Sequence, residues 1–136
     1  DVRSKLNKDL GFSKEDRKEN LRRIAHVAEL LDEKANVDFV IASFVSPRNE
    51  FREMIDNIIK NMKLIYVKCS VEECERRDVK GMYKKAREGE IEDFTGIDAP
   101  FEAPEQPDIE INTDQLSIEE SLNKAMEYII PKTTYK

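Results

Sequence analysis

The chain has 136 residues, a length typical of one domain, and 38% of them are charged against 39% that are hydrophobic. Its formal net charge of −6 argues against a general nucleic-acid binder, and no apolar run approaches the ~20 residues of a membrane span. The two cysteines, Cys69 and Cys74, are too few for a disulfide framework or a structural zinc site. We therefore expect one cytoplasmic domain over residues 1–136, with neither nucleic acid nor a membrane as partner.

The first two predicted elements are a helix and a buried strand. Ser13 followed by Asp16 is a capping pattern, and apolar residues then recur at helical spacing, which predicts a helix over residues 13–34. Residues 37–44 contain a short run that is apolar throughout and rich in β-branched side chains. Such a run is typical of a strand buried on both faces of a parallel sheet.

The middle of the chain repeats this order. Ser46 followed by Pro47 predicts a helix start, with the serine as N-cap and the proline in the first helical position. Residues 64–69 predict a second strand. Ser70 with Glu73 then gives another capping pattern and a third helix.

The last part begins with an irregular stretch over residues 78–107, which contains three glycines and three prolines. Residues 108–112 predict a brief strand, and Ser117 with Glu120 starts the final helix. Alternating strands and helices predict an α/β fold with a parallel sheet flanked by helices. In such sheets, ligands bind beyond the carboxyl ends of the strands. That rule points to residues 43–46, to the segment after Cys69 and to the residues after Asn112.

Positive charge is concentrated in one segment. Residues 76–87 carry one acid, Asp78, and six cations: Arg76, Arg77, Lys80, Lys84, Lys85 and Arg87. A solvated helical face is the ordinary explanation for such a run. Because the run follows a strand end and precedes a glycine-containing stretch, we interpret about residues 76–98 as a lid that closes over phosphates.

Five further residues, in three groups, suggest an anionic ligand with a planar ring. Arg17 and Asn20 extend the apolar stripe of the first helix, so they are expected to face inward and grip a ligand, although an internal ion pair or cap would also explain them. Phe12 and Phe94 lie on polar loops, where a ring can stack on a ligand, although core packing is the commoner role. The helix start at Ser46 could bind a phosphate, although serine there is more often only the cap. No Walker A, H-E-x-x-H or C-x-x-C pattern occurs, and no metal ligand is assigned.

Several segments closely resemble adenylylsulfate kinase (APS kinase), in the right order and over residues 1 to about 130. They are Asp1-Val2-Arg3, Asp9-Leu10-Gly11-Phe12-Ser13, Asp16-Arg17-Lys18-Glu19-Asn20, Ser43-Phe44-Val45-Ser46-Pro47, Cys74-Glu75-Arg76-Arg77-Asp78, Lys80-Gly81-Met82-Tyr83-Lys84-Lys85-Ala86-Arg87 and Phe94-Thr95-Gly96-Ile97-Asp98. The resemblance implies a P-loop kinase fold, usually dimeric. It also implies that ATP and Mg²⁺ serve to phosphorylate the 3′-hydroxyl of adenosine 5′-phosphosulfate (APS), giving PAPS for sulfate assimilation.

The same resemblance implies roles for individual residues. Arg3, Arg17 and Asn20 would hold the phosphosulfate and ribose of APS. Phe12 and Phe94 would sandwich its adenine. Val45 and Ser46 would border the APS pocket, and Lys80 would reach the substrate from the lid. Arg77 would meet the ATP phosphates, and Ser46 is a candidate phosphoserine. Lys80, Arg77 and Ser46 are thus the expected catalytic residues.

The sequence departs from the family at its start. Family members carry a P-loop, its helix and an Asp-Gly-Asp motif ahead of the segment that matches Asp1-Val2-Arg3, and none of these precedes Asp1. We therefore expect the N-terminal strand and P-loop to be missing, and residues 1–136 alone to be inactive. Two alternatives are a non-catalytic APS- or PAPS-binding relative and another P-loop kinase, such as a nucleoside monophosphate kinase. The stretch beginning at Phe94 disfavours the second.

Overall fold

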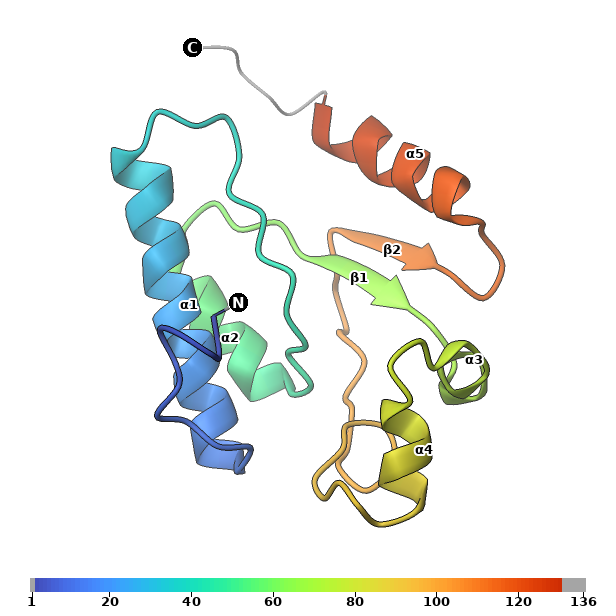
Figure 1. The fold of residues 1–136 in the computed structure, drawn as a ribbon. Coiled ribbons are helices and arrows are strands. Elements are labelled where there is room, and N and C mark those ends of the chain that lie inside the picture. The colour runs from blue at the N-terminus through green and yellow to red at the C-terminus, as the bar shows by residue number, and fades with distance from the viewer. Residues whose placement is uncertain (1, 131–136) are drawn as a thin grey trace. The chain divides into compact units, whose positions relative to one another are not determined.

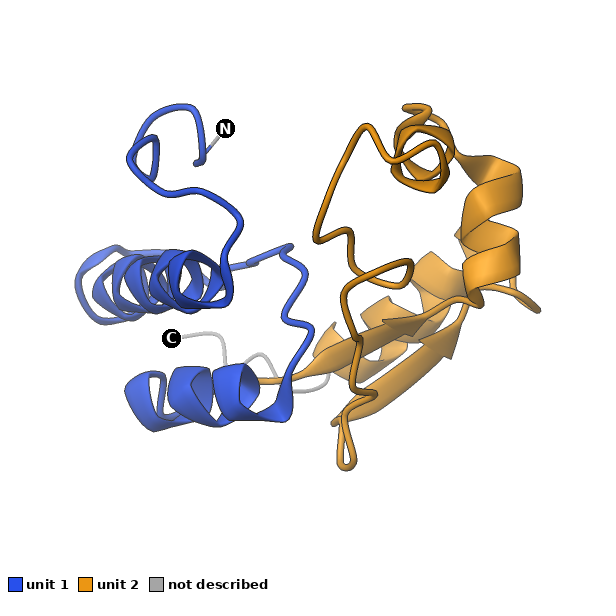
Figure 2. Cartoon of the chain, turned by 90° about the horizontal axis from the view of Figure 1, so that it is seen from below, with its two compact units in different colours: residues 1–62 blue, residues 63–136 orange. Residues whose placement is uncertain are grey.

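The structure is a computed structural model that describes residues 2–130. The chain forms two compact units, residues 1–62 and residues 63–136, which are coloured separately in Figure 2. Within residues 2–130, no helix is both long and apolar enough to cross a lipid bilayer.

The first unit is built on two packed helices, α1 (Lys14–Lys34) and α2 (Asn49–Ile58), shown in Figure 1. As predicted, α1 begins after Ser13, whose side chain accepts a hydrogen bond from the Asp16 N–H at 3.1 Å. The core of the unit contains Leu21, Ala25 and Ala28 of α1 and the fully buried Phe51 of α2.

The helix start predicted at Ser46 is wrong. Helix α2 begins at Asn49, and its N-cap is Arg48, in an extended conformation and without a side-chain capping bond. Arg52 explains the difference, because its guanidinium donates to the Ser46 carbonyl and, at 2.6 Å, to Asn49 Oδ1. This contact holds Ser46 outside the helix, so Ser46 is not positioned to bind an anion at a helix N-terminus.

The strand predicted over residues 37–44 is also wrong, because this segment is a coil. Its apolar side chains lie exposed, with Phe39 at 44% and Ile41 at 84%. A strand needs a hydrogen-bonded neighbour, and within residues 2–130 the only sheet has two strands, neither of which includes this segment. Apolar, β-branched composition therefore did not suffice to make a strand here.

The second unit contains that sheet, formed by β1 (Ile65–Lys68) and β2 (Ile109–Asn112). The strands are parallel, and Ile65 pairs with Ile109. Both were predicted. Asp108, just before β2, accepts from the Leu64 N–H just before β1 at 2.8 Å.

Between residues 63 and 130, the second unit also contains the helices α3 (Val71–Arg77), α4 (Met82–Arg87) and α5 (Ile118–Ile129). Helix α3 follows the carboxyl end of β1, and α5 packs on β2 (Figure 1). The capping bonds predicted at Ser70 and Ser117 are both present.

Helix α4 corrects the prediction that residues 78–107 are irregular throughout. Its start is stabilised by Asp78, whose carboxylate accepts from the N–H groups of Tyr83 and Lys84, each at 3.1 Å. Gly81 supplies the left-handed turn that enters the helix, with φ of 63°.

Candidate functional site

In the first unit, two arginines flank one exposed aromatic ring. The guanidinium carbons of Arg3 and Arg17 lie 4.5 and 5.7 Å from the centroid of Phe12, whose exposed fraction is 60%. Main-chain carbonyls fix both arginines, because Arg3 Nη1 donates to Gly11 O at 2.8 Å and Arg17 Nε donates to Phe12 O at 2.7 Å. The cluster offers a ring face and two forked cations, which suits a planar ligand carrying negative charge.

Asn20 lies one helical turn from Arg17, and it is only 5% exposed, as predicted for an inward-facing residue. Its Oδ1 accepts from Asn7 Nδ2 at 2.9 Å, and Asn7 is completely buried. Arg17 itself is half-buried. The structure thus brings Arg3, Phe12 and Arg17 together at the start of α1, with Asn20 beneath them.

Val45 and Ser46 precede α2 on the coil of the first unit. Val45 is 65% exposed, whereas Ser46 is half-buried. The contact from Arg52 to the Ser46 carbonyl fixes this loop, and Arg52 is 7% exposed. Sequence reasoning missed Arg52, because only its buried contacts distinguish it from the other surface-type arginines of the chain.

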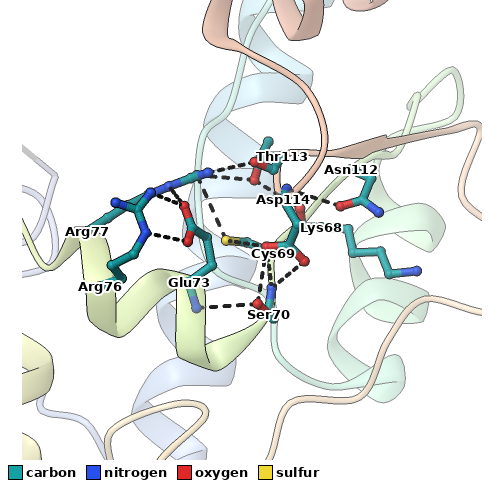
Figure 3. Close-up of polar contacts among 9 residues, drawn as sticks. All are labelled: Lys68, Cys69, Ser70, Glu73, Arg76, Arg77, Asn112, Thr113 and Asp114. Atoms are coloured by element: carbon teal, nitrogen blue, oxygen red, sulfur yellow. Dashed lines mark hydrogen bonds and ion pairs between the residues drawn. The ribbon is translucent and has the colours of Figure 1, made fainter.

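In the second unit, polar side chains meet where the two parallel strands end (Figure 3). Arg77 of α3 donates to the Thr113 carbonyl at 2.6 Å and to Thr113 Oγ1 at 3.4 Å. Thr113 Oγ1 in turn donates to the Lys68 carbonyl at 3.0 Å. The rule for parallel sheets pointed to the residues after Asn112, and the structure does bring them against the segment after Cys69.

Asp114 ties the start of α3 to the end of β2. Its carboxylate accepts from the Ser70 N–H at 3.1 Å, from Ser70 Oγ at 3.2 Å and from Cys69 Sγ at 3.4 Å. The bond from the Ser70 N–H is the main cause that lowers the pKa of Asp114, because it favours the charged carboxylate. Neither Thr113 nor Asp114 was named individually from the sequence.

Glu73 holds the two adjacent arginines of α3. It accepts from Arg76 through two bonds of 2.6 Å and from Arg77 Nε at 2.7 Å (Figure 3). Hydrogen bonds from Arg76 and then Arg77 lower the pKa of Glu73 to about 2, so Glu73 is ionised at neutral pH. The guanidinium of Arg77 is thereby fixed between an acid on its own helix and the loop that follows β2.

A pocket of about 360 Å³ lies beside this network, between the end of β1, α3 and α4. Its lining residues are Cys69, Cys74, Arg77, Asp78, Val79, Lys80, Met82 and Tyr83. Burial is the main cause that raises the pKa of Cys69 to about 11 and that of Tyr83 to about 12, so both are neutral at pH 7. The pocket therefore combines uncharged side chains with two cations, Arg77 and Lys80, and with the Asp78 carboxylate, which accepts from N–H groups at the start of α4.

Phe94 packs within the second unit rather than standing free. Its ring meets Tyr83 edge-on, with centroids 4.9 Å apart and planes at 75°. Phe94 is half-buried, so its environment differs from that of Phe12. The two phenylalanines belong to different units, and their expected pairing around one ring stays a prediction.

Part of the positive segment has the ordinary role of surface ion pairing. Arg76 pairs with Glu73 at 2.6 Å, Arg87 with Glu75 at 2.6 Å and Lys84 with Glu88 at 4.0 Å. Within residues 2–130, Lys80 makes no such pair, and it lines the pocket instead. Over the same residues, no group of three or more His, Cys, Asp or Glu side chains could hold a metal ion.

Comparisons with known proteins agree with the resemblance. The family model for adenylylsulphate kinase matches residues 1–112. Similar curated proteins include the adenylyl-sulfate kinase of Bacteroides thetaiotaomicron, 50% identical over 99% of this chain and 67% of its own length, and that of Staphylococcus haemolyticus, 52% identical over 94% and 64%. This chain thus spans about two thirds of the length of these relatives.

The structural comparison supports the same assignment. The fold is similar to the Mycobacterium tuberculosis APS kinase, solved in complex with AMPPNP and APS, with a TM-score of 0.85 and 38% identity. The match covers 95% of this chain and 75% of the solved one. The parallel sheet with flanking helices is therefore that of the P-loop kinase fold expected from the sequence, and the chain belongs to the adenylylsulfate kinase family.

Proposed function

We propose that this protein transfers the terminal phosphoryl group of ATP to the 3′-hydroxyl of APS and so produces PAPS for sulfate assimilation. Family membership supports the reaction class, and a relative binds both APS and an ATP analogue. The observation that carries the proposal is the cluster of Arg3, Phe12 and Arg17 above Asn20. A nucleotide that carries a phosphosulfate needs both the ring and the cations that this cluster offers.

In this proposal, the first unit binds APS. Arg3 and Arg17 donate to its anionic oxygens, and the exposed face of Phe12 stacks on the adenine. Asn20 donates to an oxygen of the phosphosulfate or ribose. Val45 and Ser46 border the APS pocket, and Phe94 is the second aromatic residue proposed to stack on the adenine.

In this proposal, cations of the second unit stabilise the phosphoryl transfer. Arg77 lies against the nucleotide phosphates and Lys80 reaches the substrate from the lid over residues 76–98, so both neutralise charge as the phosphoryl group moves. Such transfer depends mainly on positioning and charge stabilisation, which a fixed guanidinium supplies. Ser46 remains a candidate site for a transient phosphate.

Mg²⁺ would accompany ATP and offset the charge of its phosphates, although residues 2–130 contain no cluster of three or more acidic, His or Cys side chains that could hold it. A homodimer is proposed from the family. A cytoplasmic setting is proposed because both cysteines are free thiols.

One experiment tests the function against its rivals. The purified protein is given ATP and Mg²⁺ with either APS or AMP, and the nucleotide products are separated by chromatography. PAPS formed from APS supports the proposal, whereas phosphorylation of AMP would indicate a nucleoside monophosphate kinase. Because residues 1–136 alone are expected to be inactive, the assay uses a version that includes the upstream segment, and binding of APS by that version without any PAPS would indicate the non-catalytic alternative.

A further inference from the structure

The first unit contains a pair of buried asparagines, one of which, Asn20, lies one helical turn from Arg17. Asn7 is 0% exposed and Asn20 is 5% exposed, although asparagine is rarely buried so completely. Asn7 comes from the loop that precedes α1, and Asn20 from α1 itself. Their contact is therefore a tie between two segments that each carry residues of the proposed APS site.

The hydrogen bonds fix which way each amide points. Asn7 Nδ2 lies 2.9 Å from Asn20 Oδ1 and 3.4 Å from the main-chain carbonyl of Asn20, which can only accept. If the Asn7 amide were turned over, its oxygen would face two acceptors. Because the nitrogen of Asn7 must point at Asn20, the side chain of Asn20 must present its oxygen to Asn7.

The orientation has a consequence for Asn20. With Oδ1 committed to Asn7, the two N–H groups of Asn20 point away from the pair, and within residues 2–130 they donate to no partner. The Oδ1 of Asn7 is buried and receives no hydrogen bond from residues 2–130, which lowers the stability of the folded protein. Stability alone would favour a residue without that orphaned oxygen.

We propose that Asn7 is a positioning residue that locks the side-chain amide of Asn20 with its N–H groups directed at APS. The proposal rests on the proposed function, in which Asn20 contacts the substrate. Fixed in this way, Asn20 recognises only an acceptor, such as an anionic or hydroxyl oxygen. Asn7 touches no substrate and acts through Asn20.

A simple anchoring role for Asn7 is the competing explanation, and the loop offers a control for it. Asp9, two residues later, also ties this loop to α1, because its carboxylate accepts from Arg23 at 2.7 and 2.8 Å. If Asn7 only anchored the loop, breaking the Asp9 tie would weaken APS binding in the same way. If Asn7 orients Asn20, the two variants differ.

The test variant Asn7→Asp replaces the amide N–H donor of Asn7 with a carboxylate oxygen of similar shape, and Asp9→Asn is the control. In Asn7→Asp, the new carboxylate draws the N–H groups of Asn20 toward itself, so the dissociation constant of APS rises by at least about tenfold. In the same variant, the dissociation constant of an ATP analogue changes by less than about twofold. In the control Asp9→Asn, the dissociation constant of APS also changes by less than about twofold. Equal APS affinity in Asn7→Asp and the parent, with both proteins folded, would overturn the proposal.

Two further measurements keep the outcome decisive. If Asn7→Asp does not fold, Asn7→Ala frees the Asn20 amide without reversing it, and APS should bind about fivefold more weakly. In the unaltered protein, NMR should show the side-chain N–H protons of Asn7 protected from exchange without ligand, and those of Asn20 only once APS is added. Protection of the Asn20 protons without APS would contradict the inference, whereas absence of APS binding in the parent would instead refute the proposed function.

Discussion

Replacing Arg17 with lysine separates the charge of this side chain from its shape. In the structure, Arg17 Nε donates to the Phe12 carbonyl at 2.7 Å while the guanidinium lies 5.7 Å from the Phe12 ring. Lysine keeps the positive charge but loses the planar fork, so it cannot hold the carbonyl and reach an anion at the same time. Arg17→Lys therefore tests whether the fork is used for APS.

The expected magnitudes follow from these contacts. A hydrogen bond to a charged group contributes about 1.5–3 kcal/mol, and the lysine recovers part of it, which leaves a loss near 1.4 kcal/mol or about tenfold in APS affinity. The Phe12 carbonyl is an exposed acceptor that water can satisfy. The free energy of unfolding should therefore fall by less than about 1 kcal/mol, and the melting temperature by less than about 5 °C.

Calorimetric titration with APS measures the change in APS affinity, and thermal denaturation measures the change in melting temperature. Arg22→Lys is the matched control, because Arg22 lies on the same helix but pairs with Glu19 at 2.7 Å. This control should leave APS affinity unchanged. A large fall in the melting temperature of Arg17→Lys with normal APS binding would refute the reasoning and assign Arg17 a structural role.

Three other predictions concern the packing and charge of the chain. In a full-length version, Phe94→Ala should raise the Michaelis constant for APS far more than that for ATP. Phe101→Ala is the control and should change neither, because the Phe101 ring stacks on Tyr66 of β1 with centroids 6.1 Å apart. An equal loss for both substrates in Phe94→Ala would contradict the stacking role. Phe51→Ala should lower the free energy of unfolding by about 3–5 kcal/mol in urea titrations, because this fully buried ring leaves a cavity, and a loss below about 1 kcal/mol would argue against the packing described. Hydrogen bonds from Arg76 and then Arg77 lower the pKa of Glu73 from 4.5 to about 2, so the stability that Glu73 contributes is present above pH 4.5 and is lost as pH falls toward 2. Acid unfolding of Glu73→Gln should lack that component, and identical profiles would count against the ion pairs with Arg76 and Arg77.

Local signals in the sequence predicted the helices that carry their own caps. Ser13, Ser70 and Ser117 each accept the expected hydrogen bond three residues later, because a capping bond depends only on neighbouring residues. Ser46 was predicted by the same rule and failed. Arg52 binds its carbonyl, and that contact depends on how α2 packs.

Non-local contacts explain what the sequence did not reveal. The strand expected over residues 37–44 has no neighbour within the described chain, and no local pattern can supply one. In the site, the inward position of Asn20 followed from helical spacing, but its partner Asn7 lies 13 residues away. Thr113 meets Arg77 across 36 residues, so only the sheet rule indicated their region in advance.

The parallel pairing of β1 and β2 has a consequence for the order in which the molecule folds. Ile65 pairs with Ile109, so the first sheet contact closes a loop of about 44 residues. The part of the loop-closure entropy that depends on loop length then costs about 3 kcal/mol. Contacts of such long sequence separation form slowly compared with helices. Arg77 and Thr113 should therefore meet late, after α3 and its serine cap exist. Pulse-labelled hydrogen exchange would detect this as protection of α3 amides before those of β2.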